Sequence, residues 1–198
     1  RTNATISLFS FQDIITGVFI QLESAINTGD VVTVAGITGT AEKLTIRSIG
    51  LRDLDGTFHL IPFSSVGSVS NYMRDYSFHT GVYGIAYRDD IDLARACLES
   101  AFEELLRMPE QASRILAPLE MHGVVELGDS AVKLRIRIKT RPGDQWGIGR
   151  IYNELVKKHF DAVGIEIPFP HTTVYLEQGG STRPGTRADS GGRAEIAQ

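Results

Sequence analysis

Apolar residues follow a helical spacing near the start of the chain. From residue 9 onward they recur three or four positions apart, which places them on one face of an α-helix. The stripe comprises Phe11, Ile14, Ile15, Val18, Phe19, Leu22 and Ile26. Asn27 and Gly29 end the pattern. It predicts an amphipathic helix over residues 9–28, which either packs among partner helices, lies at a membrane surface or is the first core helix of a globular domain.

Residues 29–75 instead show the two-residue alternation of short β-strands. Leu44, Ile46 and either Ile49 or Leu51 are expected to point inward, and Lys43, Arg47 and Arg52 outward. About four or five such strands in this stretch predict a small β-barrel or a strongly bent sheet.

Turn residues separate these strands. Asp55-Gly56 predicts a hairpin with a type I′ turn, because both residue types tolerate a positive φ. Gly36 and Gly39 bracket a second tight turn. Pro62 is expected to end a strand, since proline cannot donate to an interior ladder.

Residues 76–178 carry a different order of elements. Strands are predicted over residues 78–87, 119–127, 131–140 and 172–176, with a helix after the first and another after the third. Asp89 and Asp90 lie where the N-cap of the first helix belongs, and Gly164 suits the end of the second. The order β-α-β-β-α-β predicts a ferredoxin-like fold, so the fold class of the whole chain is α+β.

Each element of this region has one apolar face. The first helix presents Ile91, Ala94, Leu98, Ala101, Phe102 and Leu105, and the second presents Ile148, Ile151, Tyr152, Leu155, His159, Phe160 and Val163. The strand at 131–140 alternates Val132, Leu134, Ile136 and Ile138 with a basic row of Lys133, Arg135, Arg137 and Lys139. This basic row is either a solvated sheet face or an anion-attracting surface, and we favour the solvated face.

The composition is that of an ordinary globular protein, with 42% hydrophobic and 22% charged residues among 198. The net charge of -4 argues against a nucleic-acid binder dominated by phosphate contacts. No run of about 18 apolar residues occurs, so the sequence predicts no membrane-spanning helix. The glycine-rich residues 179–198 predict a disordered tail.

Nothing in the sequence predicts catalysis. The five histidines lack metal-ligand spacing, and the single cysteine, Cys97, is expected to be a buried thiol on an apolar helix face. Helix capping explains Asp89, Asp90 and Asp92 more simply than cation binding does. We therefore expect no enzyme, no catalytic residue, no metal and no cofactor.

Several short motifs occur in a fixed order. Residues 15–62 contain an inner Gly17, then Gly29-Asp30, Gly36-x-x-Gly39-x-Ala-x-x-Leu, Ile49-x-Leu-Arg-x-x-Asp-Gly and Ile-Pro. The segments GIAYRDDIDLARACLESAF and FDAVGIEIPFPHTTVYL follow, the latter at residues 160–176. Together, over about residues 9–178, they resemble the family of mechanosensitive channels of small conductance.

The resemblance implies a homo-heptamer of the bacterial inner membrane that opens under membrane tension and releases ions and small solutes on osmotic downshock. Residues 9–28 would be the second half of the pore helix. Residues 29–75 would be an Sm-like β domain, and residues 76–178 the α/β domain of a cytoplasmic vestibule.

The resemblance also implies roles for individual residues. The packing and hinge region of the pore helix would contain Phe9, Phe11, Ile14, Gly17 and Val18. A strand with Thr172, Val174 and Leu176 would join the copies at the base of the vestibule. Close helix contact at Gly17 is physically reasonable, because a glycine lets two backbones approach.

The N-terminal end departs from the family pattern. Counted back from Gly17, the pore-sealing leucines would fall near Arg1 and Thr5, and the hinge glycine near Phe9. We therefore expect residues 1–8 to be an atypical segment, partly foreign to the channel. The family's first two membrane helices, through which the channel would meet the lipid bilayer, are missing from this chain.

Two other function classes stay open. One is a soluble Sm-like module that binds nucleic acid; the acidic balance of charges disfavours it, and we expect no nucleic-acid partner. The other is a ferredoxin-like regulator that senses small molecules, for which the sequence shows no pocket signature.

Overall fold

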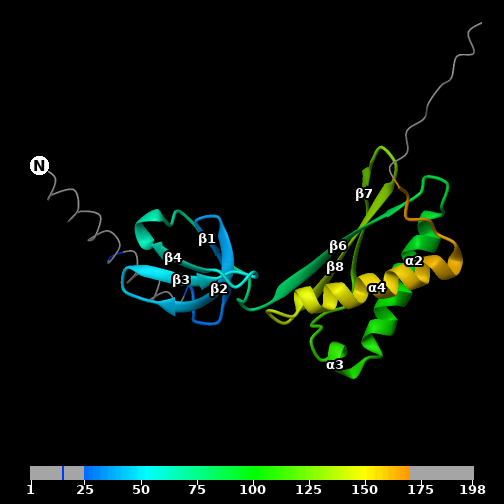
Figure 1. Ribbon diagram of the computed structural model, residues 1–198. Coiled ribbons are helices and arrows are strands. Elements are labelled where there is room, and N and C mark those ends of the chain that lie inside the picture. Colours follow the sequence, from blue (N-terminus) through cyan, green and yellow to red (C-terminus); the bar gives the residue numbers. More distant parts are fainter. Residues whose placement is uncertain (1–14, 16–24, 170–198) are drawn as a thin grey trace, which may run out of the picture.

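The computed structural model describes residue 15 and residues 25–169, which form two folded units in a row (Figure 1). Ile15 is helical. The expected segment 1–8, the strand at 172–176 and the tail at 179–198 lie outside the described residues, as does nearly all of the expected helix at 9–28.

The first unit is a five-stranded antiparallel sheet in the order β4-β3-β2-β1-β5. Its strands are β1 (Val31–Val34), β2 (Ile37–Leu44), β3 (Ser48–Arg52), β4 (Phe58–Pro62) and β5 (Val69–Asn71), with a short 3-10 helix at Phe63–Ser65. The sheet buries a core of Ile26, Val32, Val34, Ala41, Ile49, Leu51, Ile61 and Phe63. Pro62 ends β4, as predicted.

The turn expected between Gly36 and Gly39 is shorter than predicted, because Gly39 lies within β2. Ala35 and Gly36, with φ of 49° and 79°, are the two residues between β1 and β2, so the two-residue turn with positive φ lies there. Asp55-Gly56 does lie in the hairpin between β3 and β4, but only Gly56 has a positive φ, of 85°. The type I′ prediction for Asp55-Gly56 is wrong, because residues 53–57 form a longer connection that a single glycine can close.

One inward prediction and one helix prediction fail in this unit. Ile46 is 57% exposed, because residues 45–47 form the bend between β2 and β3 rather than a strand. Ile49 and Leu51 are both buried. Ile26, expected on the helix stripe, is not helical: it is only 2% exposed and packs in the core of the sheet.

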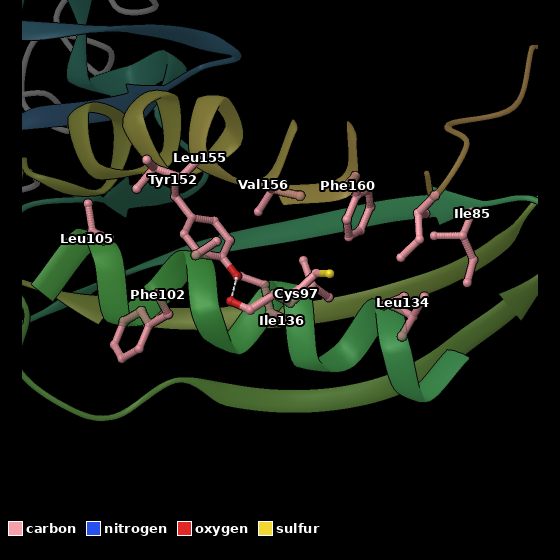
Figure 2. Packing of buried hydrophobic residues seen from close by; sticks show 14 of the residues in the cluster. Ile85, Cys97, Phe102, Leu105, Leu134, Ile136, Tyr152, Leu155, Val156 and Phe160 are labelled. Carbon is pink, nitrogen blue, oxygen red and sulfur yellow. Dashed lines mark hydrogen bonds between the residues drawn. The ribbon is translucent and has the colours of Figure 1, made fainter. Parts of the chain in front are cut away.

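The second unit contains β6 (Ser77–Ile85), α2 (Ile91–Leu106), the short α3 (Pro109–Ala112), β7 (Glu120–Leu127), β8 (Val132–Thr140) and α4 (Gln145–Val163). Its strands form an antiparallel sheet in the order β6-β8-β7. Helices α2 and α4 pack against each other and against one face of this sheet (Figures 1 and 2). The described order β-α-β-β-α agrees with the predicted order up to its last strand.

The core between helices and sheet forms as the apolar periodicity predicts. Its buried side chains include Ala94, Leu98, Ala101, Phe102 and Leu105 of α2, Val132, Leu134, Ile136 and Ile138 of β8, and Ile148, Tyr152, Leu155 and Phe160 of α4. The buried Tyr152 hydroxyl donates to the Leu98 carbonyl at 2.8 Å, which ties α4 to α2 (Figure 2). Val163 is an exception at 45% exposed, because α4 ends there and Gly164, with φ of 76°, turns the chain away.

Gly39 allows a close approach between β2 and β3. A Cβ atom at this position would lie 2.5 Å from the backbone oxygen of Arg52, and backbone cannot move aside as a side chain can. We predict that Gly39→Ala lowers the free energy of unfolding by about 1–3 kcal/mol, measured by urea unfolding. Gly67→Ala is the matched control, since a Cβ at Gly67 meets nothing within 4 Å. Equal unfolding midpoints for the two variants would contradict the argument.

Candidate functional site

The described residues were expected to hold no metal and no reactive thiol. Within residues 25–169, no group of three or more His, Cys, Asp and Glu side chains could hold a metal ion. Cys97 is buried on the core face of α2, as predicted, and burial raises the pKa of its thiol. Two other features of the described residues bear on function: the contacts that attach the terminal segments, and the surfaces open to partners.

The residues predicted to act in the pore helix and in the assembly strand lie outside the described residues. They are Phe9, Phe11, Ile14, Gly17 and Val18 at one end, and Thr172, Val174 and Leu176 at the other. The structure does describe the two places where these segments join the folded units, and both are built from specific contacts.

The N-terminal attachment centres on the carboxylate of Asp30. Its Oδ2 accepts hydrogen bonds from the backbone N–H of Asn27 at 2.9 Å and from Nδ2 of Asn71 at 2.8 Å. The same Nδ2 of Asn71 donates to the carbonyl of Ala25 at 3.0 Å. The end of β5 is thereby bound to the segment at 25–30, which enters the unit just before β1.

Gly29 completes this attachment on the other side. It has a φ of 96°, which a side chain would strain, and its N–H donates to the Ala41 carbonyl at 2.7 Å. The Ala41 N–H in turn donates to the Asp30 carbonyl at 2.8 Å. These contacts explain the Gly29-Asp30 motif.

The sequence does not point to a structural role for Asn71, because its partners lie more than 40 residues away in the sequence.

The C-terminal attachment holds the chain after α4 against the end of β6. The Glu166 N–H donates to Asp89 Oδ2 at 2.9 Å, its carbonyl accepts from the Ala86 N–H at 3.2 Å, and its carboxylate pairs with the Arg88 guanidinium. Ile165 is buried beside them. These contacts fix the direction in which the chain leaves the second unit.

Asp89 and Asp90 have separate roles here. Asp90 is the N-cap of α2, and its side chain accepts from the N–H groups of Asp92 and Leu93. Helix capping is confirmed for Asp90 but is wrong for Asp89, whose carboxylate binds the chain after α4 instead. No sequence signal distinguishes the two neighbours, because the partner of Asp89 follows it by 77 residues.

The basic row of β8 lies on the sheet face opposite the helices, as predicted, but its cations are largely engaged. Lys133 pairs with Glu126 at 2.7 Å and Arg137 with Glu120 at 2.8 Å, both acids belonging to β7. Arg137 also lies over the ring of Phe78, 3.8 Å from its centroid. The hydrogen bond from Arg137 lowers the pKa of Glu120. An internally paired row of this kind suits a solvated face better than a binding surface for polyanions.

Both sheets present strands with a free side. Among the described strands, β4 and β5 border the first sheet, and β6 and β7 border the second. A strand with unpaired backbone groups can add another strand from a neighbouring chain. Phe58 and Leu60, both on β4, are exposed large apolar side chains. The described units therefore offer edges suited to association.

The two folded units coincide with two parts of one known family. The family described as "Mechanosensitive ion channel, beta-domain" matches residues 10–74, and "Mechanosensitive ion channel MscS, C-terminal" matches residues 79–167. The chain belongs to the MscS family of mechanosensitive ion channels. This confirms the resemblance drawn from the sequence motifs. The family is one of ion channels rather than of enzymes.

Individual relatives agree with this assignment. The chain is 39% identical over 157 residues to the "Moderate conductance mechanosensitive channel YbiO" of Escherichia coli, a match that spans 79% of this chain and 21% of that protein. It is 30% identical to a "Small-conductance mechanosensitive channel" of Caldanaerobacter subterraneus, over 84% of this chain and 58% of that protein. The chain thus spans about a fifth of the length of the Escherichia coli protein and somewhat over half of the length of the Caldanaerobacter subterraneus protein.

A solved structure has the same fold. The "Crystal Structure of Helicobacter pylori MscS (Closed State)" superposes with a TM-score of 0.70 at 22% sequence identity, covering 89% of this chain and 69% of that one. The mixed α+β architecture is thereby confirmed as MscS-like. No helix in the described part of this MscS-family chain has the length and apolar content to cross a bilayer.

The Asp30–Asn71 attachment predicts a coupled loss of stability. Asp30→Ala and Asn71→Ala should each lower the free energy of unfolding by about 1 kcal/mol, because each leaves hydrogen-bond partners unmatched. The double variant should lose less than the sum of the two, because both remove one shared hydrogen bond. Urea unfolding measures all three against Asp55→Ala, a carboxylate on the exposed hairpin. Strict additivity would show that the two side chains do not act together.

Proposed function

We propose that this chain is the vestibule-forming region, together with the second half of a pore helix, of a channel that opens under membrane tension and releases ions and small solutes on osmotic downshock. The observation that carries the proposal is the coincidence of two consecutive family matches with two folded units in the same order. The names of the relatives from Escherichia coli and Caldanaerobacter subterraneus support the same activity.

The sheet orders support the finer architecture that we propose. The order β4-β3-β2-β1-β5 suits an Sm-like domain over residues 29–75. The order β6-β8-β7, with both long helices on one face, suits a ferredoxin-like domain over residues 76–178. Thr172, Val174 and Leu176 would lie on the last strand and join the copies of the chain. The chain after α4 is held firmly at Glu166, which supports a defined path for that strand.

The pore helix would lie within residues 9–28 and end before Ala25, because residues 25–28 are not helical. Its packing and hinge region would contain Phe9, Phe11, Ile14, Gly17 and Val18. Ile15 is helical and exposed, which leaves an apolar position free for a neighbouring helix. The Asp30–Asn71 attachment begins directly after this helix, so a displacement of the helix would pull on β1 and β5.

The assembled channel would be a homo-heptamer in the bacterial inner membrane, with this region on the cytoplasmic side. Contact with the lipid bilayer would come through helices that precede this chain. The border strands β4, β5, β6 and β7, each paired on one side only among the described strands, support self-association. The paired basic row of β8 gives no support to the nucleic-acid alternative.

Electrical recording tests the activity. The whole protein that contains this chain, expressed in cells without other mechanosensitive channels, should give stepwise currents when graded suction is applied to a membrane patch. Gly17→Leu should abolish these currents or raise the suction they require, because a bulky side chain keeps neighbouring helices apart. Asp55→Asn, on an exposed hairpin, should change neither. Protein present in the membrane without suction-dependent current would refute the proposal.

The assembly has a separate test. Light scattering on the purified protein should give a mass of about seven chains. A monomer at micromolar concentration would count against assembly through these two units. It would not refute the channel activity, which the electrical recording tests separately.

A further inference from the structure

The imidazole of His79 lies between strand β6 and helix α4. On β6 it shares the helical side of the sheet with the buried Ser77 and Ile85, because every second residue of a strand lies on the same face. Its ring meets the ring of Tyr152 of α4 edge to face, with centroids 6.4 Å apart. His79 is therefore part of the packing that holds α4 on the sheet.

Gly149 of α4 makes room for this ring. A Cβ atom built at position 149 would collide with the imidazole of His79. The backbone of the helix thus lies directly against one side of the ring. A change in the charge or the hydration of the ring acts on the backbone of α4 itself.

One nitrogen of the ring, Nε2, is enclosed. It has almost no accessible surface and no hydrogen-bond partner among the described residues. A neutral imidazole can leave one nitrogen without a proton, whereas the charged form carries an N–H on both nitrogens. Protonation of His79 would therefore place an N–H at Nε2 with neither water nor an acceptor to receive it, which costs free energy.

Within the described strands, no negative charge faces the ring to offset this cost. Strand β6 pairs with β8, where His79 lies opposite Ile138 and near the buried Thr140. Ser77 precedes His79 on the same face of β6. Tyr83 lies further along that face, and burial raises the pKa of its hydroxyl, which therefore stays neutral. The strands supply only uncharged neighbours.

Helix α4 brings no carboxylate to the ring either. Its residues that line the hollow beside His79 are Gln145, Trp146, Gly149, Arg150 and Asn153. Arg150 is the charged side chain of this set, and a guanidinium repels a second positive charge. Burial raises the pKa of the Tyr152 hydroxyl, which stays neutral. Asp144, which precedes the helix, pairs with Arg114 at 3.5 Å.

These surroundings determine how the packing responds to acid. Burial lowers the pKa of His79 below its ordinary value of 6.5. The unfolded chain therefore takes up this proton at a higher pH than the folded chain does, so acid favours opened states. The stability that the neutral ring supports is complete above about pH 7.5, and it is lost progressively as the pH falls below about 6.5.

We propose that His79 is an acid-sensitive contact between β6 and α4, and that protonation of its ring loosens the first part of α4, residues 145–156, from the sheet. Trp146 lies in this part of α4 and meets Tyr72 of the connection between the units, with ring centroids 6.2 Å apart. Loosening would therefore extend to the junction of the two units. The contact acts through packing within the second unit, so it does not depend on the channel activity.

Hydrogen exchange followed by mass spectrometry tests the proposal. The purified protein is compared at about pH 7.5 and about pH 5.5, with exchange times scaled for the pH dependence of the chemical step. In the parent protein, the amides of residues 145–156 should exchange several-fold faster in acid. The amides of β1, β2 and β3 should keep their protection, because the core of the first unit does not contain His79.

The fluorescence of Trp146 gives a second measurement, because it is the single tryptophan of the chain. The indole is 43% exposed and its edge contact with Tyr72 depends on the position of α4. Its emission should move to longer wavelength as the pH falls below about 6.5, since a loosened helix exposes more of the indole to water.

Substitutions assign the response to one residue. His79→Leu has a side chain that cannot be protonated, so both acid responses should disappear, and His79→Gln serves the same purpose if the leucine variant does not fold. His122→Gln is the matched control. It removes an exposed histidine of β7 that pairs with Glu120 at 3.6 Å, and it should respond to acid as the parent does.

Three outcomes would overturn the proposal. One is an equal acid response in the parent and in the His79 variants, because another group would then be responsible. Another is a loss of protection that is spread evenly over both units. The third is unchanged protection of residues 145–156 in the parent at the two pH values, a result that needs no variant.

Discussion

The described part of the chain is governed by one constraint: each unit buries its own hydrophobic core, and the two cores share no residue. The first core lies within the bent antiparallel sheet, and the second between one sheet face and the helices α2 and α4. The connection between them is residues 72–76, braced by the Tyr72–Trp146 contact and by Met73 beside Gly143. Two units with separate cores and a small junction can each keep their fold while their relative position changes.

Much of this fold could be predicted because it depends on local periodicity. The alternation at Val132–Thr140 and the apolar face of α2 determine which side chains are buried, whatever their neighbours are. The failures have non-local causes. Ile26 follows the helical spacing but is recruited into the core of the sheet, and Ile46 continues the strand alternation but falls in a bend. The periodicity of apolar residues does not reveal where a helix or a strand ends.

The functional features were harder to predict for a related reason. Asp89 and Asp90 are identical neighbours, yet one caps α2 and the other binds the Glu166 N–H, a contact that exists only after α4 has packed. The basic row of β8 could be recognised, but not its partners, because the order β6-β8-β7 decides that Glu120 and Phe78 flank Arg137. The junction between the units has no sequence signature either, since Tyr72 and Trp146 lie far apart in the sequence.

The end of β5 links the N-terminal attachment to the junction between the two folded units. Asn71 faces the N-terminal attachment, where it holds Ala25 and Asp30, and the next residue, Tyr72, meets Trp146 at the junction. Asn71 is the last residue of β5 and Tyr72 follows it directly, so the two contacts are one residue apart. A pull on the segment before β1 therefore acts on β5, and β5 bears directly on the junction with α4.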